Sequence, residues 1–292
     1  MGLRQLATFV WNHPLNANGR FSALGRVVRW QCVSRLIAGP IALPFVEGTS
    51  LFAMRGMTGA TGNWYCGLHE VREMAFVLHL LRAKDHFLDV GANVGSYTVL
   101  AGGAVGARVT AVEPIPETFA HLARNIALNG LGTRVRACQC GLSEASGVLR
   151  FTRGLDSVNH VLAAGELVPA IEVPVQTLDD LVGSDAPVLM KIDVEGHERA
   201  VLVGAIRTLA DPTLLAVVME TNGSGSRYGV SDAELVSLMH GHGFLPHGYD
   251  PFRRTLVDAR EADGNTVFVR DRTAVEARLS GSKRYRLING TI

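Results

Sequence analysis

Short runs of β-branched and apolar residues alternate with longer segments of helical periodicity from about residue 85 onward. Strand patterns cover residues 86–90, 108–112, 134–140, 188–192 and 214–219. Helical patterns cover residues 96–104, 117–128 and 198–209. Continuous apolar strands separated by helices are typical of a parallel sheet that is covered on both faces. The pattern therefore predicts an α/β fold with a doubly wound, mostly parallel sheet.

Three later regions depart from this alternation. Residues 147–176 contain short strands and turns, which we interpret as an excursion over the edge of the sheet. Apolar runs at 243–249, 254–257 and 266–269 predict that the sheet finishes with antiparallel strands. Polar and basic residues dominate 278–292, where we expect a loosely ordered tail.

The amino-terminal part of the chain has a different pattern. Residues 24–37 have helical spacing, and residues 41–46 and 50–55 flank Glu47-Gly48-Thr49, which indicates a β-hairpin. The polar face of the predicted helix carries Arg26, Arg29 and Arg35. We divide the chain into an N-terminal extension of helix and hairpin, a main α/β domain and a polar C-terminal tail. These parts cover residues 1–62, 63–272 and 273–292.

Composition and charge narrow the class of protein. The chain has 292 residues, of which 47% are hydrophobic and 19% charged, so intrinsic disorder is excluded. The 28 Lys and Arg nearly balance the 27 Asp and Glu, and the formal net charge is +1. This balance argues against a nucleic-acid partner held by a bulk positive field. Glycine is abundant, with 32 residues, which indicates places where the backbone turns tightly or approaches a ligand closely.

The sequence has no apolar run of membrane-spanning length, because its longest candidate, 36–46, is interrupted by Pro40 and Pro44. An arginine in the first apolar stretch argues against a signal peptide, and Leu6 stands where myristoylation requires Ser or Thr. We therefore expect a cytoplasmic protein whose cysteines are buried free thiols. These cysteines are Cys32, Cys66, Cys138 and Cys140.

The first motif with chemical content is FLDVGANVGSY, at residues 87–97. A strand ends at Asp89, and Gly91 and Gly95 then bracket a tight turn into a helix. Such a loop lies at the carboxyl edge of the sheet, where open α/β folds bind ligands. The loop lacks two glycines of the dinucleotide fingerprint G-x-G-x-x-G, so it suits a cofactor with a cationic or hydroxyl-rich head better than one with phosphates.

The second motif supplies an acidic residue at the end of the next strand. Glu113, in TAVEP, directly follows the strand pattern 108–112 and lies 24 residues beyond Asp89. A carboxylate in this position can accept hydrogen bonds from both ribose hydroxyls of an adenosine. Together, in this order, the two motifs predict a cofactor that contains adenosine.

The third motif, LMKIDVEGHE, places Asp193 at the carboxyl end of the fourth parallel strand. Lys191 lies on the same face of that strand, so we expect a partly buried pair with Asp193. Glu195 follows in the loop, and Glu198 falls in the first helical turn, where a capping role is the favoured interpretation. His197 fits a base, a substrate contact and an ordinary loop histidine equally well.

Glu220 ends the strand LLAVVME and faces the same edge of the sheet as Asp193. Together these two carboxylates could hold a divalent cation. No H-x-H or D-x-D cluster supports one, however, and we do not expect a metal.

These motifs, in this order, resemble the FkbM family of S-adenosylmethionine-dependent methyltransferases. The resemblance runs from about residue 63 to about residue 250, and it rests on NWYCGLHE, DVGANVGSYT, TAVEPIPETFAHLARNIALN, CGLSEASG, TLDDL, KIDVEGHERAVLVGA and VVMET. It implies the class I methyltransferase fold, a Rossmann-like seven-stranded sheet with one antiparallel strand pair, and S-adenosyl-L-methionine as cofactor.

The resemblance also implies roles for single residues. Cofactor binding is implied for Glu70, Asp89, Gly91, Asn93, Gly95, Tyr97, Glu113, Leu142 and Ser143. The loop of Asp89, Gly91, Asn93 and Gly95, with Tyr97 behind it, resembles the segment that holds the methionine end of the cofactor. Glu113 resembles the carboxylate that binds the ribose. Leu142 and Ser143 resemble the segment along the adenine. Asp193 resembles the residue near the methyl group.

The family is described as methylating oxygen, often on hydroxyls of sugars or polyketide products, so we expect a small-molecule or glycan acceptor. A positioned base speeds transfer to a hydroxyl by roughly 10²–10⁴-fold. Our hypothesis is that Asp193 or His197 is this base and that Glu195 and Glu220 orient the acceptor. Whether oxygen is preferred over nitrogen stays open.

Two other functions share this layout. A nicotinamide-dependent oxidoreductase has the same order of strands and acidic residues, but the missing glycines and the lack of a Tyr-x-x-x-Lys pair count against it. A binding module that lost turnover is the second alternative. The N-terminal helix, with Trp30 and Leu36, either touches a membrane or lipid-linked sugar or packs on the main domain or a second subunit of a homodimer, and packing is favoured.

Overall fold

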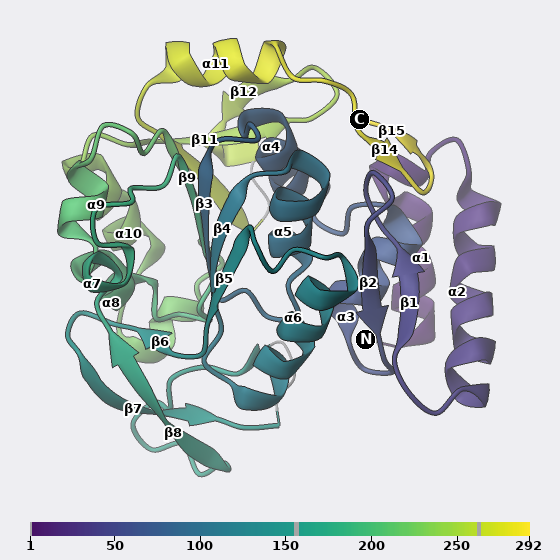
Figure 1. The fold of residues 1–292 in the computed structure, drawn as a ribbon, viewed down its shortest axis with the longest axis horizontal. Helices are drawn as coiled ribbons and strands as arrows, with labels where there is room; N and C mark the ends of the chain where they lie inside the picture. The colour runs from purple at the N-terminus through teal and green to yellow at the C-terminus, as the bar shows by residue number, and fades with distance from the viewer. Residues whose placement is uncertain (1, 155–157, 262–263) are drawn as a thin grey trace.

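The computed structural model describes residues 2–154, 158–261 and 264–292, and a large sheet runs through its centre (Figure 1). In these residues the sheet has eight strands in the order β12-β11-β13-β10-β9-β3-β4-β5. The strands are β3 (His86–Val90), β4 (Arg108–Val112), β5 (Val135–Cys138), β9 (Leu189–Ile192), β10 (Ala216–Glu220), β11 (Leu245–Asp250), β12 (Thr255–Asp258) and β13 (Asn265–Val269). The α/β prediction is confirmed.

Strand direction follows the predicted pattern. The neighbours from β5 through β4, β3 and β9 to β10 are parallel, whereas β13 is antiparallel to both β10 and β11. The eighth strand, β12, pairs with β11 and extends the outer edge without changing the order of the other seven. The sheet thus has one strand more than the seven expected.

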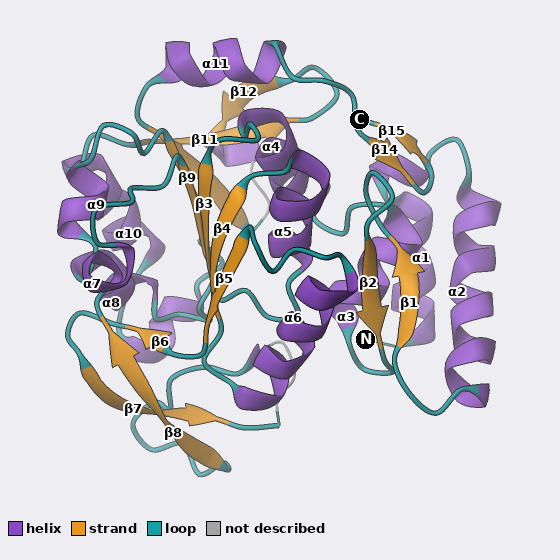
Figure 2. Cartoon of the chain, in the orientation of Figure 1, coloured by secondary structure: helices purple, strands orange, loops and turns teal. Residues whose placement is uncertain are grey.

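Helices cover both faces of the sheet (Figure 2). One face carries α4 (Val71–Leu80), α5 (Ser96–Val99) and α6 (Pro116–Leu128), and the other carries α7 (Leu178–Val182), α8 (Glu198–Val203), α9 (Ile206–Ala210) and α10 (Asp232–Gly241). Because side chains alternate along a strand, the neighbours Phe87 and Leu88 belong to two different hydrophobic cores. Continuous apolar strands therefore pack well between these two cores.

Two predicted helices are interrupted. The segment 96–104 forms α5 followed by a π-helical stretch, η2 (Leu100–Val105). The segment 198–209 divides into α8 and α9 at Gly204, where a Cβ atom would lie 2.2 Å from the carbonyl oxygen of Ser143. The backbone at Gly204 can lie this close to Ser143 only because glycine has no side chain. The continuous amphipathic pattern of 198–209 does not indicate this contact.

The N-terminal extension shares the hydrophobic core of the α4–α6 face. It contains α1 (Leu3–Asn12), α2 (Arg20–Leu36) and the antiparallel hairpin of β1 (Ile41–Pro44) with β2 (Ser50–Ala53), and α3 (Thr58–Cys66) crosses the boundary placed after residue 62. Asn129 at the end of α6 bonds both the N–H and the C=O of Ser50, at 2.8 Å each. Arg26 was expected on a polar face; it is half-buried instead, because its guanidinium donates to the carbonyl of Tyr65 at 2.7 Å.

The expectation of a loosely ordered tail is wrong. Helix α11 (Arg272–Ser280) is followed by a small hairpin of β14 (Arg286–Leu287) and β15 (Gly290–Thr291), which lies beside the N-terminal extension in Figure 1. Tyr285 and Ile292 are buried and exchange backbone hydrogen bonds of 2.8 and 3.0 Å. Asn289 donates to the carbonyl of Leu15 at 3.0 Å. A few buried side chains anchor this polar segment.

The excursion predicted at 147–176 forms a separate sheet of β6 (Gly141–Leu142), β8 (Ala170–Gln176) and β7 (Gly147–Thr152), and residues 155–157 lie outside the described part. The four cysteines are free, but only Cys66 and Cys140 are buried as expected, whereas Cys138 is partly buried and Cys32 is exposed. Among the helices described, none has the length and apolarity needed to cross a membrane.

Candidate active site

The loop after β3 depends on left-handed backbone conformations. Gly91, Asn93 and Gly95 have φ angles of +76°, +51° and +91°. A Cβ atom on Gly91 would lie 1.8 Å from the carbonyl oxygen of Asp193, at the end of the neighbouring strand β9. One on Gly95 would lie 2.6 Å from the Cδ1 atom of Leu122 on α6. The loop is therefore seated between the end of β9 and α6 in a way that requires glycine at both positions.

Glu113 holds the loop from the end of β4. Its carboxylate accepts hydrogen bonds from the backbone N–H groups of Asn93 and Ile115, each at 3.0 Å. The side chain is buried, and burial raises the pKa of Glu113 to about 7, although the two backbone hydrogen bonds oppose the shift. The residue can therefore offer a carboxylate oxygen to a ligand at the mouth of this loop.

Asp89 lies beneath the loop and does not line the cavity described below. It is fully buried; one carboxylate oxygen accepts a hydrogen bond from Thr98 at 2.6 Å, and the other has no partner among the described residues. Burial raises the pKa of Asp89, and the nearby Lys191 charge opposes this shift. We therefore place Asp89 under the site, where it supports the loop and not a ligand directly.

Lys191 is the buried cation at the centre of the site. Its Nζ atom donates to the Oδ2 atom of Asp193 at 2.8 Å, which confirms the predicted pair, and it lies 4.9 Å from the ring centre of Tyr97. Tyr97 in turn donates to Glu70 at 2.6 Å. Burial opposes the lysine charge, but the carboxylates of Asp193, Asp89 and Glu70 outweigh it and raise the pKa of Lys191. The positive charge of the Lys191 ammonium group thus offsets the negative charges of several carboxylates.

Three carboxylates meet beyond this pair. One oxygen each from Asp193, Glu195 and Glu220 lies within 4.8 Å of the others, and we call these residues the acidic triad. Burial and neighbouring carboxylates raise the pKa of Glu195 to about 7 and that of Glu220 to about 8. The oxygens are of the kind that divalent cations take as ligands, and strand spacing alone did not indicate that Glu195 joins the other two.

His197 and Glu198 have different surroundings. The Nε2 atom of His197 lies 3.1 Å from the Oγ atom of Ser143, and the imidazole packs edge-on against Tyr228 with 5.8 Å between ring centres. Burial lowers the pKa of His197, so the ring is neutral near pH 7. Glu198 accepts hydrogen bonds from the N–H groups of Val194 and Gly196 at 3.0 and 3.2 Å, so its carboxylate holds the loop before α8 and does not cap the first turn of that helix.

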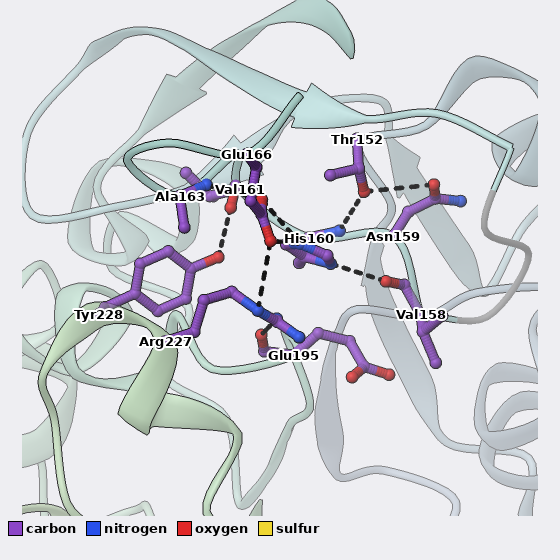
Figure 3. Close-up of polar contacts among 10 residues, drawn as sticks. All are labelled: Thr152, Val158, Asn159, His160, Val161, Ala163, Glu166, Glu195, Arg227 and Tyr228. Carbon is purple, nitrogen blue, oxygen red and sulfur yellow. Dashed lines mark hydrogen bonds and ion pairs between the residues drawn. The ribbon is translucent and has the colours of Figure 1, made fainter. Parts of the chain in front are cut away.

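A polar network closes the outer side of the site (Figure 3). Arg227, on the short helix η4 (Ser224–Tyr228), donates to the carbonyl of Glu195 at 2.8 Å and lies 3.8 Å from the carboxylate of Glu166. Glu166 also pairs with His160 at 3.1 Å. Tyr228 donates to the carbonyl of Val161. Glu195 has a φ angle of +55°, and this network holds its backbone in place.

These groups surround a cavity of about 240 Å³ at the carboxyl ends of β3, β4, β9 and β10. Ten of the predicted site residues line it. They are Glu70, Gly91, Asn93, Tyr97, Glu113, Leu142, Asp193, Glu195, His197 and Glu220. Asp89, Gly95 and Ser143 lie outside its lining, beneath or behind the groups that form it.

Comparison with known proteins shows the family of this chain. A profile of the Methyltransferase FkbM domain matches residues 89–246, which is more than half of the chain. The chain belongs to the FkbM methyltransferase family. The resemblance inferred from the motifs is confirmed, and membership of a methyltransferase family replaces the oxidoreductase alternative.

Relatives within and around the family have diverse acceptors. The 31-O-demethyl-FK506 methyltransferase FkbM of Streptomyces tacrolimicus is 33% identical over 202 residues, covering 56% of this chain and 74% of its own. The hexuronic acid methyltransferase AglP of Haloferax volcanii is 29% identical over 209 residues, covering 66% and 81%. A solved methyltransferase FkbM from Methylobacillus flagellatus KT is 19% identical with a TM-score of 0.45, over 72% of this chain and 52% of that one.

The sequence patterns did not indicate the part of the candidate site that comes from distant segments. Unpredicted residues that line the cavity include Thr58, His69, Thr118, Phe151, Asn159 and Val161. The network residues His160, Glu166, Arg227 and Tyr228 were also missed. Most of these residues lie in loops or short irregular segments, and no local spacing marks them as partners.

Proposed function

We propose that this FkbM-family protein transfers the methyl group of S-adenosylmethionine to a hydroxyl oxygen of a sugar or natural-product acceptor. The observation that carries the proposal is that the glycine loop, Glu113 and the acidic triad all open on one cavity. The names of the two curated relatives, which act on a demethylated natural product and on a hexuronic acid, support this class of acceptor.

The residues around the loop fit the cofactor. Gly91 lines the cavity, and its lack of a side chain lets the loop pack against the carbonyl of Asp193, while Glu113 provides a buried carboxylate beside it. We assign Glu113 to the ribose hydroxyls, Leu142 to the adenine and the Tyr97–Glu70 pair to the methionine end. When bound, the cofactor supplies an electrophilic methyl group on a sulfonium.

The chain must then position the acceptor and accept one proton. Alignment of the acceptor oxygen is the larger task, because the sulfonium methyl is already activated. As the new O–C bond forms, the hydroxyl proton must pass to a base. We assign this role to the Glu195–Glu220 pair, because its pKa values of about 7 and 8 are closer to neutral pH than that of an ordinary carboxyl. Asp193 is already paired with Lys191, and His197 is engaged with Ser143.

The proposal is tested directly by turnover. Purified protein is incubated with S-adenosylmethionine and a panel of hexuronic acids, neutral hexoses and 31-O-demethyl-FK506, and release of S-adenosylhomocysteine is measured. Formation of a methyl ether on at least one panel member supports O-methylation. Binding of S-adenosylhomocysteine without turnover on any of them would favour the silent binding module.

Glu113→Gln is expected to weaken binding of S-adenosylhomocysteine by about 10–100-fold at pH 8. A hydrogen bond to a charged group contributes about 1.5–3 kcal/mol, and the amide would also place an N–H group against a backbone donor. Calorimetry measures the dissociation constant. Glu117→Gln, an exposed carboxylate at the start of α6, is the control and should leave the affinity unchanged. Equal affinities for the two variants would refute the role of Glu113.

The rate of methyl transfer should rise with pH between about 6 and 9, because the base must lose its proton and the carboxyls of Glu195 and Glu220 have pKa values of about 7 and 8. The charges of Asp193 and Glu195 help to raise the pKa of Glu220. In Glu195→Gln, the acid limb of the kcat profile should therefore move to lower pH, whereas Glu220→Gln should lose roughly 10²-fold or more in kcat.

The same pH profile is expected after treatment with EDTA, since the proposed base acts without a metal. A flat profile from pH 6 to 9 in the wild-type protein would remove the Glu195–Glu220 pair from the role of base. Loss of activity in EDTA that returns with Mg²⁺ would show that the acidic triad holds a cation instead.

A further inference from the structure

Helix α2 has an apolar stripe on each of two opposite faces. Its inner face contributes Ala23, Val27 and Trp30 to the core. Its outer face exposes Phe21, Val28 and Leu36, with exposed fractions of 81%, 62% and 84%. These three side chains are seven and eight residues apart, which places them on one side of the helix. We call them the outer stripe.

The outer stripe lies at one end of the molecule. Figure 1 has the longest axis of the protein horizontal, and α2 forms its right-hand end, beyond α1 and the β1–β2 hairpin. The inner stripe already provides the packing of this helix on the rest of the chain. The outer stripe therefore makes no contribution to the core, and three large exposed apolar side chains on one helix face indicate a surface that meets another apolar phase.

The N-terminal segment that carries the outer stripe has charges of one sign. The first 46 residues contain five arginines and no Asp or Glu, although the whole chain has a net charge of only +1. Arg29 and Arg35 are exposed and follow or precede members of the stripe, so they flank it on the helix surface. An apolar stripe with arginines beside it is typical of a helix that lies in the plane of an anionic lipid surface.

An aromatic pair at the start of α2 supports the same partner. Trp11 of α1 packs edge-on against Phe21 with 5.4 Å between ring centres, and Arg20 lies 5.3 Å from the Trp11 ring. Trp combines an apolar ring with one N–H donor, which suits the boundary between headgroups and acyl chains. The pair extends the outer stripe to the turn between the two helices.

We propose that the outer stripe of α2, with its flanking arginines, docks this protein on an anionic lipid bilayer. The helix lies on the surface and the main domain stays in water. This docking is independent of the methyltransfer chemistry, because no residue of the stripe lines the cavity between the sheet and its loops. A variant that no longer docks should therefore still bind S-adenosylhomocysteine. An experiment can thus contradict the docking proposal without contradicting the proposed function, and the reverse also holds.

Co-sedimentation with vesicles tests the proposal. The wild-type protein should bind vesicles of phosphatidylcholine with phosphatidylglycerol, bind pure phosphatidylcholine much less, and dissociate as NaCl is raised. Phe21→Ser/Val28→Ser/Leu36→Ser should lower the partition coefficient by more than about 10-fold. Arg29→Gln/Arg35→Gln should lower it by about 30-fold, at about 1 kcal/mol for each charge. Tryptophan emission should shift to the blue on binding, and Trp11→Phe should remove most of the shift.

The matched control is Val148→Ser/Leu167→Ser, which removes two exposed apolar side chains from the β7–β8 region at the other end of the fold. Its partition coefficient should equal that of the wild type. Equal binding by the stripe variant and this control would overturn the proposal, as would no binding to anionic vesicles. A wild-type dimer that becomes monomeric in the stripe variant would assign the face to a second copy of the chain and also overturn it.

Discussion

Lys191→Met is expected to lower the free energy of unfolding by about 3–5 kcal/mol near pH 7, the usual cost when one partner is removed from a buried ion pair. The lysine side chain is only 5% exposed and stands among the carboxylates of Asp193, Asp89 and Glu70. Asp89 is fully buried and has one oxygen without a hydrogen-bond partner among the described residues, so the Lys191 charge is a main factor that favours its ionised form. Urea denaturation measures the loss.

The free energy of unfolding that Lys191→Met loses should also increase as the pH rises from acid to neutral. Burial already raises the pKa of Asp89 above its ordinary value, and removal of Lys191 raises it further. A group whose pKa is raised by folding contributes stability at low pH and loses it as the pH rises from its unfolded pKa through its folded pKa. The variant should therefore be closest to the wild type in acid and furthest from it near neutral pH.

Two further variants separate charge from packing. Lys191→Met/Asp89→Asn should recover part of the stability, because the buried carboxylate is then neutral and the two sites are coupled. Lys84→Met, at an exposed lysine on the loop before β3, is the matched control and should change the free energy of unfolding by less than about 0.5 kcal/mol. A small loss in Lys191→Met, or no recovery in the double variant, would contradict this account of the site.

Gly91→Ala is expected to abolish measurable binding of S-adenosylhomocysteine and to cost about 2–5 kcal/mol in stability. The left-handed conformation, with φ at +76°, accounts for about 1–2 kcal/mol. Overpacking accounts for about 1–3 kcal/mol more, since the new Cβ atom would lie 1.8 Å from the carbonyl oxygen of Asp193. Backbone cannot rotate away as a side chain can, so the loop after β3 must separate from the end of β9.

Gly130→Ala isolates the conformational part of this effect. Gly130 also has a positive φ, +63°, but a Cβ atom there would have no neighbour within 4 Å. We expect a loss of about 1–2 kcal/mol from the backbone alone and unchanged affinity for S-adenosylhomocysteine. If calorimetry and urea denaturation give the same values for the two alanine variants, the close approach of Gly91 to Asp193 is not what shapes the site.

The sequence contained enough information to place four acidic residues at one edge. Glu113 and Asp193 directly follow a strand, Glu220 ends one, and Asp89 is the second-to-last residue of β3. Because parallel strands bring their carboxyl ends to the same edge, strand order alone predicted that these residues lie near one another. Period-two alternation also predicted that Lys191 and Asp193 pair, and the distance of 2.8 Å confirms it.

Single positions within the site could not be predicted in this way. Whether an acidic residue lines the cavity or lies under it depends on the height of the loop above the sheet. Asp89 is thus buried beneath the site, whereas Glu113 lies at its surface with two backbone donors. Arg26 likewise turned inward to meet the carbonyl of Tyr65, which no helical wheel indicates.

The sequence by itself determined the class of fold, the mostly parallel direction of its strands and the family, since apolar periodicity and short motifs are local properties of the chain. Only the tertiary structure decided which distant groups meet. The side chain of Glu195 joins those of Asp193 and Glu220, Arg227 reaches its carbonyl, and Asn289 ties the C-terminal hairpin to the N-terminal extension. These contacts join residues far apart in the chain, and their geometry exists only after both cores have packed.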